Sequence, residues 1–339
     1  MANPSDSSAN YGADPTPVSP QLVHDLRTAM TIELATLPTY LYTYWSIKPR
    51  SQGGSVAGEQ AAKAILSVVT EEMLHFALVG NIINSLGVIP AVNDPAYIPT
   101  YPGSLPGHSS TENPFVVSLQ PLNALAIKIM LDIELPASVE DITGPPTTDG
   151  WATIGEFYAA LKKELTPDLD YSHGRQLAPD NNPGPGVLIQ VDSHRAAMQA
   201  INEIVDQGEG FTLPKKGPQE RDGDHELAHY YKFLEIQQAW DAGAIDASRD
   251  VYPVIGDPFT GVYNAEQKAA NKAFNVLYSQ LLDSLQDTLT SPSPNVWGAP
   301  TRYMVDMQQA VNYLRNTGEV AGTGKLPGPT FEYIPASDR

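Results

Sequence analysis

Residues 57–86 carry the pattern that most restricts the fold of this chain, because apolar residues recur there with a helical period. The stripe consists of Ala61, Ala64, Ile65, Val68, Val69, Phe76, Val79, Ile82, Ile83 and Leu86, the spacing of one buried helix face. Glu72 and His75 fall in the gap of this stripe and therefore point toward the core. A buried carboxylate is costly unless it is paired, protonated or bound to a metal ion. We predict a core helix that carries either a metal-binding pair or a buried acid paired with lysine or tyrosine beside a core histidine.

The rest of the chain alternates helical patterns with connections rich in proline and glycine, of which there are 30 and 26. Apolar periodicity predicts helices over residues 20–47, 57–86, 121–135, 151–165, 193–207, 224–240, 264–289 and 300–316. Residues 88–120 and 166–192 are long connections, and strand alternation is not convincing anywhere. The expected fold is mainly α, a helix bundle with long irregular crossover loops and extra C-terminal helices.

Three regions are expected along the chain. Residues 1–19 are polar and predict a disordered N-terminal arm. Residues 20–240 would form the bundle, and residues 241–339 a C-terminal helical extension packed on it within the same globular unit. The arm lacks the charged and apolar regions of a signal peptide, so a cytoplasmic location is expected.

Composition excludes several classes of function. Acidic residues outnumber basic residues 39 to 20, for a formal net charge of −19. Nucleic acids and anionic membranes attract basic surfaces, so neither is an expected partner. The absence of cysteine excludes disulfides, thiolate metal sites, iron–sulfur clusters and cysteine nucleophiles. Any metal ion must therefore be held by oxygen and imidazole donors.

Two further predicted helices place a glutamate on an apolar face. Glu33 lies inside the stripe of residues 20–47, and Glu134 stacks on Ile127 and Met130, seven and four residues before it. Glu134 could instead be an ordinary helix-end carboxylate. With Glu72, three predicted helices would direct a glutamate toward the core.

A second Glu-x-x-His pair occurs at Glu226 and His229, and His225 adds a His-x-x-x-His spacing. On a helix these residues would share one face. With seven histidines in 339 residues, chance supplies fewer than one such pair. The alternative is a solvated segment, because residues 222–226 are highly charged.

Two Glu-x-x-His pairs with further glutamates match the donor set of ferritin-like di-iron and di-manganese bundles. The spacing lets one carboxylate bridge two ions while its histidine caps one of them. Carboxylate-rich ligation suits hard ions that change redox state. Glu156, Glu203 and Glu209 are additional candidate carboxylates from the later helices. Tyr40, one of several aromatics near helix ends, either orients the ligands or simply packs in the core.

Six segments carry a resemblance to a known family: 33–42, 71–75, 153–158, 207–210, 229–233 and 328–333. They read ELATLPTYLY, EEMLH, TIGEFY, QGEG, HYYKF and GPTFEY. Together they resemble the ferritin-like family related to the iminophenyl-pyruvate dimer synthases of bisindole pigment biosynthesis. The resemblance runs from about residue 20 to residue 334. Those synthases are much longer proteins, and this chain resembles only their ferritin-like portion.

The resemblance implies a ferritin-like four-helix bundle and specific ligands. It assigns Glu33, Glu72 and His75 as metal ligands and matches Glu134 and Glu209 to positions where the family also places carboxylates. His229 matches a Ser-His-Tyr segment of the family, although Ala228 replaces the serine here. Either Glu209 or Glu226 could therefore supply the carboxylate that binds a metal ion together with His229.

The expected function is that of a di-metal oxidase or oxygenase acting on a small organic substrate, such as an aromatic compound, in secondary metabolism. Its catalytic residues would be Glu33, Glu72, His75 and Tyr40, and its metal ligands Glu33, Glu72, His75, Glu134, Glu209 and His229.

Two iron ions are expected, with manganese as the alternative, O₂ or peroxide as the oxidant, and haem as a less favoured cofactor. The chain could form a homodimer or associate with pathway enzymes. Two other functions stay open: iron handling, and a non-catalytic scaffold that kept the bundle.

Overall fold

The computed structural model describes residues 16–106, 115–136, 151, 153–208, 227–291 and 295–339. Its bundle is built from six helices: α1 (Pro20–Ser46), α2 (Val56–Ser85), α3 (Ala124–Ile133), α4 (Ile154–Glu164), α5 (His194–Gly208) and α6 (His229–Asp241). They are followed by α7 (Ala247–Asp250), α8 (Ala265–Thr290) and α9 (Gly298–Asn316). Short 3₁₀ turns lie at Arg50–Gln52, Pro179–Asn181, Thr260–Val262 and Ala336–Asp338. The mainly α class and the eight predicted helices are confirmed.

Local sequence signals explain where these helices begin. A polar residue precedes each of four bundle helices and accepts a hydrogen bond from its first turn: Ser19, Ser55, Asn123 and Thr153. At α8, Asn264 and Gln267 form a reciprocal capping box. The turn after α2 contains Gly87 with φ of 70°, the left-handed conformation that glycine adopts at helix C-termini.

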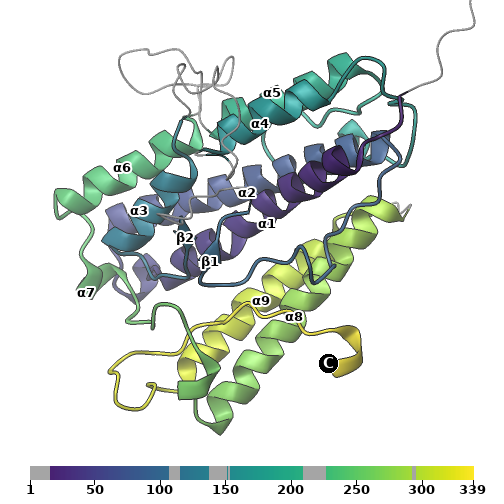
Figure 1. The fold of residues 1–339 in the computed structure, drawn as a ribbon. Coiled ribbons are helices and arrows are strands. Elements are labelled where there is room, and N and C mark those ends of the chain that lie inside the picture. Colours follow the sequence, from purple (N-terminus) through teal and green to yellow (C-terminus); the bar gives the residue numbers. More distant parts are fainter. Residues whose placement is uncertain (1–15, 107–114, 137–150, 152, 209–226, 292–294) are drawn as a thin grey trace, which may run out of the picture.

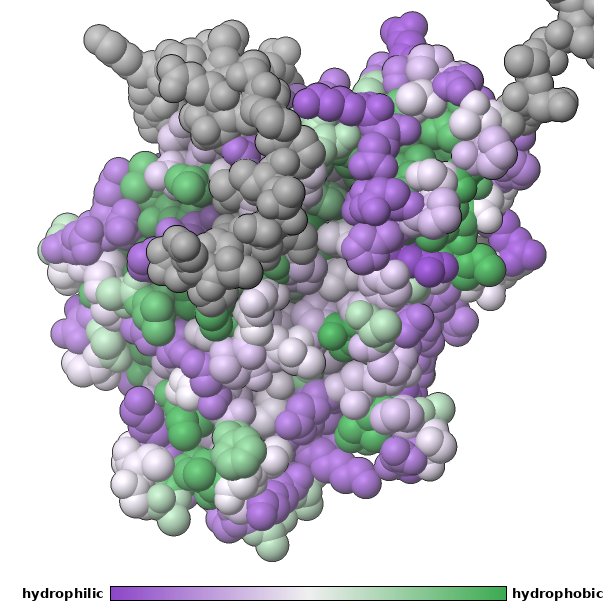
Figure 2. All heavy atoms as spheres, viewed as in Figure 1, coloured by the Kyte–Doolittle hydropathy of each residue, from purple (hydrophilic) through white to green (hydrophobic). Residues whose placement is uncertain are grey.

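The α1–α2 pair is the centre of the molecule (Figure 1), and at about 1.5 Å per residue these helices are roughly 40 Å long. The shorter helices α3, α4, α5 and α6 cover one side of the pair, and the α8–α9 hairpin lies on the other side. Side chains buried in these interfaces form one continuous hydrophobic core. On the face drawn in Figure 2, hydrophobic residues form small separate groups among hydrophilic ones.

The extension after residue 241 packs directly on the bundle. Gly80 of α2 allows a close approach, because a Cβ there would lie 2.5 Å from Leu289 of α8. Trp45 at the end of α1 contacts Phe274 of α8 and stacks on Phe331 of the C-terminal segment, with ring centroids 6.0 Å and 5.9 Å apart. These contacts join the C-terminal segment to α1 and α2 through shared apolar surface.

Two details differ from the sequence-based expectations. A small antiparallel hairpin, β1 (Gly103–Ser104) with β2 (Val116–Val117), lies within the connection where no strand was predicted. The last four residues of the expected disordered arm are placed: Thr16 pairs with Asp168 through its backbone, and Ser19 caps α1. Residues 1–15 of that arm lie outside the described residues.

α2 has the length and apolar composition of a membrane-spanning helix. However, 83% of its most apolar 18-residue window is buried inside the protein. This is the situation of a core helix surrounded by other helices.

Candidate metal centre

Four helices direct buried acidic and imidazole groups to one point in the bundle. α1 contributes Glu33, α2 contributes Glu72 and His75, the end of α3 contributes Glu134, and the start of α6 contributes His229. No side chain of the five is more than 5% exposed. The structure therefore brings together five of the six residues predicted as ligands, from segments up to about 200 positions apart in the chain.

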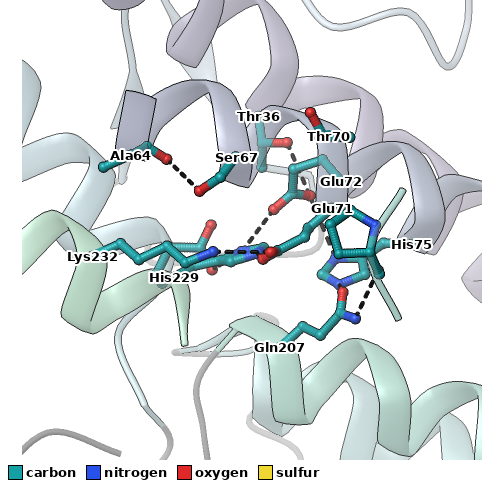
Figure 3. Close-up of polar contacts among 12 residues, drawn as sticks. Thr36, Ala64, Ser67, Thr70, Glu71, Glu72, His75, Gln207, His229 and Lys232 are labelled. Atoms are coloured by element: carbon teal, nitrogen blue, oxygen red, sulfur yellow. Dashed lines mark hydrogen bonds and ion pairs between the residues drawn. The ribbon is translucent and has the colours of Figure 1, made fainter. Parts of the chain in front are cut away.

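Glu72 lies between the two histidines, and its two oxygens face different partners (Figure 3). Its Oε1 is 3.0 Å from His229 Nδ1, and its Oε2 is 3.6 Å from His75 Nδ1. The imidazole rings are stacked, with centroids 5.3 Å apart and an angle of 28° between their planes. Two donor groups result, Glu33–Glu72–His75 and Glu72–Glu134–His229, each with its ligand atoms within 4.8 Å of one another. Glu72 belongs to both groups, which is the position of a carboxylate that bridges two ions.

Glu33 and His75 of the first group are each oriented by a further side chain. The Tyr158 hydroxyl donates a hydrogen bond to Glu33. Gln207 Oε1 lies 2.9 Å from His75 Nε2, so the amide oxygen can accept the proton on that nitrogen while Nδ1 faces the carboxylates. Partners of this kind fix the tautomer and ring orientation of histidine ligands.

The second group repeats the arrangement with different side chains. Tyr40 Oη donates to Glu134 Oε1 at 2.5 Å, which is the ligand-orienting position predicted for this tyrosine. His229 Nε2 lies 2.6 Å from Glu71 Oε2, and Lys232 Nζ donates to the other oxygen of Glu71 at 2.9 Å (Figure 3). Glu71 thus joins a histidine of the donor group to a buried lysine on the same helix, α6.

Burial and mutual charge shift the protonation of these groups in the metal-free protein. Burial, reinforced by Glu72, raises the pKa of Glu33 to about 7. The pKa of His75 rises to about 10, because the attraction of Glu72 and Glu33 exceeds the desolvation that opposes it. Desolvation also opposes ionisation of Glu71, but hydrogen bonding and attraction from His229 and Lys232 lower the pKa of Glu71 to about 2. Both imidazoles and the Lys232 ammonium thus lie in direct contact with the carboxylates of the centre.

The donor atoms fit divalent ions. His229 Nδ1 is completely buried, and its contacts with Glu72 Oε1 at 3.0 Å and Glu134 Oε2 at 3.5 Å do not have hydrogen-bond geometry. A buried nitrogen without a well-aligned hydrogen bond is costly, and binding to an ion relieves that cost. Oxygen and imidazole ligands lie roughly 2 Å from an ion, so donor atoms 3.0–3.6 Å apart can reach a common centre.

A small cavity of about 20 Å³ lies among these donors, bordered by α4 and α5. Its volume is enough for roughly one water molecule. Gly208 at the end of α5 contributes to its wall, and a Cβ there would lie 3.2 Å from Glu134 Oε2. A side chain at position 208 would crowd this carboxylate.

The remaining predicted ligands have different outcomes. Glu209, His225 and Glu226 lie outside the described residues. The structure places neither Glu156 nor Glu203 in a donor group; Glu203 accepts hydrogen bonds from Gln207 and from the Val187 backbone. Of the pair Glu226 and His229, His229 alone lies in the described part of the chain. α6 begins at His229, after Ala228 in extended conformation, so the predicted helix start at residue 224 is too early.

Helical periodicity does not reveal three residues of the centre: Glu71, Tyr158 and Gln207. Glu71 lies off the apolar stripe of α2, a position typical of a solvated side chain, but it is completely buried. The sequence does indicate this burial indirectly. Between Met73 and Leu86 it has no lysine, arginine, aspartate or glutamate, so this half of α2 lacks a solvent-exposed face. Gln207 and Tyr158 carried no comparable signal, because amides and tyrosines are common at helix surfaces.

The fold and the donor groups define a ferritin-like protein, and comparison with known proteins agrees. The ferritin-like family profile matches residues 26–238, and the chain belongs to this family. In overall fold it resembles a ferritin-like protein of Caulobacter vibrioides, with a TM-score of 0.64 and 22% identity. That likeness covers 94% of this chain and 100% of the Caulobacter chain.

Two relatives with described activities are similar in sequence. Dichlorochromopyrrolate synthase of Lentzea aerocolonigenes is 25% identical over 95% of this chain and 38% of its own length. The 2-imino-3-(indol-3-yl)propanoate dimerase of Chromobacterium violaceum is 24% identical over 64% of this chain and 23% of its own length. The chain therefore spans well under half the length of both relatives, which are biosynthetic enzymes.

Proposed function

We propose that this protein is a two-metal oxidase or oxygenase that acts on a small organic molecule in secondary metabolism. The observation that carries the proposal is the position of Glu72, whose two oxygens face the two histidines of two overlapping donor groups. A structural acid would need one partner, whereas this carboxylate is shared between two complete sets of three donors. The arrangement is that of a pair of ions bridged by one glutamate.

Iron is the proposed metal, and manganese is the alternative. Three carboxylates and two imidazoles, without a thiolate, suit ions that take oxygen and nitrogen ligands. When bound, a pair of redox-active ions would supply electrons to O₂ or peroxide. The protein's own residues would hold that pair: Glu33 and His75 on one side, Glu134 and His229 on the other.

The surrounding side chains would keep the donors in place during turnover. Tyr40 and Tyr158 each donate a hydrogen bond to one terminal carboxylate, so neither carboxylate can rotate freely. Gln207 and Glu71 hold the outer nitrogens of the histidines. Nearly complete burial excludes bulk water and strengthens each of these interactions.

The substrate class rests on the relatives rather than on the cavity. Both relatives are named for making dimeric or pyrrole-containing products from organic precursors, which supports a small organic substrate, aromatic compounds included. The described residues leave only about 20 Å³ beside the donors. A cytoplasmic location, a homodimer and association with pathway enzymes remain proposals that accompany this function.

Elemental analysis with an absorption spectrum tests the proposal. Protein loaded anaerobically with Fe(II) should hold about two ions per chain, and exposure to O₂ should change its spectrum. Glu72→Gln should lower the metal content below one ion per chain, because it removes the shared ligand. Glu156→Gln, which replaces an acid outside both donor groups, should leave the content unchanged.

Other results would support the competing functions. Metal content well below one ion per chain after loading would contradict a metal enzyme and leave a scaffold role. Elution as a cage of about 24 chains, with hundreds of iron ions taken up, would indicate iron storage. A strong Soret band in the purified protein would indicate haem.

A further inference from the structure

A second site candidate lies on the opposite side of the α1–α2 pair, where α9 packs. Two adjoining cavities of about 430 Å³ and 350 Å³ occur there. Both are lined by Tyr44, Trp45, Leu66 and Gln308, so they meet along these residues. Each lies in the size range of cavities that hold small organic ligands.

The larger cavity is predominantly apolar. Met73 of α2, Met304 and Val305 of α9, and Trp297 just before α9 line its walls. Methionine and tryptophan side chains adapt to varied apolar shapes and offer a large contact area. This half of the site is suited to a hydrocarbon or aromatic body.

The smaller cavity combines apolar walls with basic side chains. Four of the 20 basic residues of the chain line it, Lys48, Arg50, Lys63 and Arg315, with Glu59 as the single acid among its lining residues. In a protein with a net charge of −19, this concentration of positive charge is unusual. Arg50 and Lys63 are each paired with Glu59, at 3.9 Å and 3.1 Å.

The other two cations of this cavity are Lys48 and Arg315, and among the described residues no carboxylate forms an ion pair with either of them. The Arg315 guanidinium lies 4.0 Å above the ring of Tyr252, and Lys48 Nζ lies 5.9 Å from the same ring. Both cations are half-buried and converge on this tyrosine at the edge of the cavity. Lys48 Nζ donates to the Ser248 carbonyl at 3.2 Å, and the Arg315 guanidinium donates to the Trp45 carbonyl and to Asn312 Oδ1. Each of these nitrogens carries a further N–H, so the two side chains can still donate to a carboxylate.

We propose that this double cavity binds a small amphipathic organic anion. Its apolar body would lie between α2 and α9, and its carboxylate would lie against Arg315 and Lys48. Charge complementarity and the continuity of an apolar cavity with a basic one are the features that select this class of ligand.

The site is separate from the metal centre and does not depend on it. Leu66, Val69, Thr70 and Met73 line the apolar cavity and follow the spacing of one face of α2. Glu72 and His75 project from another face, toward α5 and α6. No member of the two donor groups lines either of the adjoining cavities.

Isothermal titration calorimetry with two matched amphiphiles tests this proposal. Decanoate and decyltrimethylammonium have the same alkyl chain and opposite charge, and both are used below their micelle-forming concentrations. Decanoate should bind saturably at one site per chain, at least about tenfold more tightly than the cation. Equal affinities would show that only apolar burial is recognised, and absence of saturable decanoate binding would show that no such site exists; either result overturns the proposal.

Matched variants locate the binding. Arg315→Gln should weaken decanoate binding about tenfold or more, whereas Arg302→Gln, on the same helix but outside the cavities, should not.

Leu66→Glu should weaken decanoate binding by placing a negative charge where the cavities meet. Its control is Leu125→Glu, which changes an exposed leucine on α3. Thermal unfolding of each variant identifies folding defects. If Arg315→Gln is unstable, Lys48→Gln and Leu66→Glu still test the site.

The Glu72→Gln variant separates this proposal from the proposed function. It should bind decanoate with unchanged affinity, because Glu72 lies outside the double cavity. Loss of decanoate binding in this variant, with the fold intact, would place the anion at the metal centre and contradict a separate site.

Discussion

At the scale of single residues, protons and metal ions compete for the same atoms. In the metal-free protein the pKa of Glu33 is raised to about 7 by burial, and that of His75 is raised to about 10 mainly by Glu72. The pKa of His229 is also well above its ordinary value, because Glu134, Glu71 and Glu72 together outweigh its desolvation. Metal ligands must be deprotonated, so each of these protons has to leave when ions bind.

The number of protons released on metal binding should therefore depend on pH. Near pH 8.5 Glu33 is already ionised, and binding should release about two protons, one from each histidine. Near pH 6 Glu33 also carries a proton, so the number should approach three, and metal affinity should fall as pH decreases. Titration with Mn(II) in two buffers of different ionisation enthalpy measures this number.

Variants identify the group responsible for the change between the two pH values. Glu33→Gln should release about two protons at both pH values, although its metal affinity will be weaker. Glu156→Gln should behave like the unaltered protein, because this acid belongs to neither donor group. A release that does not change between pH 6 and 8.5 would contradict the raised pKa of Glu33.

Residue-level prediction from sequence succeeded where helical periodicity defined a core face. Glu72 and His75 interrupt a long apolar stripe, so periodicity alone is enough to predict their burial. The burial of Glu71 could not be predicted by the same rule, because periodicity assumes a solvent-exposed face that this half of α2 does not have. The role of Gln207 could not be predicted from periodicity either, since the packing of α5 on α2 brings this side chain to His75.

At the scale of elements, Glu71 is one of two acids of α2 that contact α6, the other being Glu72. Glu71 binds His229 and Lys232, which lie on adjacent turns at the start of α6. All three groups are almost fully buried. Removing one partner of a buried ion pair leaves the other charge uncompensated, at a cost of about 3–5 kcal/mol.

We expect Glu71→Gln to destabilise the metal-free protein by a few kcal/mol and to weaken metal binding by about 10- to 100-fold. Combining it with Lys232→Met should recover much of the stability, because the buried ammonium that loses the Glu71 carboxylate is then absent. Metal affinity should stay low in the double variant, since His229 Nε2 still lacks the Glu71 carboxylate that orients the ring. Urea unfolding and Mn(II) titration of the two single variants and the double variant measure both effects.

Recovery of metal affinity in the double variant would show that Glu71 acts only as the partner of Lys232. It would then have no role in orienting His229. A single Glu71→Gln variant with unchanged stability would contradict the buried ion pair itself.

The elements themselves were largely predictable, and their ends were less so. The long periodic patterns gave α1, α2 and α8 to within a residue or two, because caps and glycines mark their ends. The predicted start of the sixth helix at residue 224 was too early, since Ala228 is extended and the helix begins at His229. The β1–β2 hairpin has two residues per strand, too short for side-chain alternation to be detected.

At the scale of the whole molecule, the C-terminal segment shares its core with the bundle. Asn84 of α2 donates to the Leu289 carbonyl of α8, and the Gln286 side chain bonds the backbone at Pro90 and Val92. The contacts of Trp45 and Gly80 with this segment are apolar. Separating the α8–α9 hairpin would expose the α1–α2 face to water, so the two parts should unfold together.

Hydrogen exchange with and without metal tests this cooperativity. The slowest amides of α2 and α8 should exchange with the same free energy, that of global unfolding. Mn(II) at about 100 times its Kd should raise the protection of both helices by about 2.7 kcal/mol, although α8 has no residue in either donor group. In Glu72→Gln the added metal should protect neither helix. If Mn(II) protects α2 but leaves α8 unchanged, the extension unfolds independently and residues 241–339 form a separate unit.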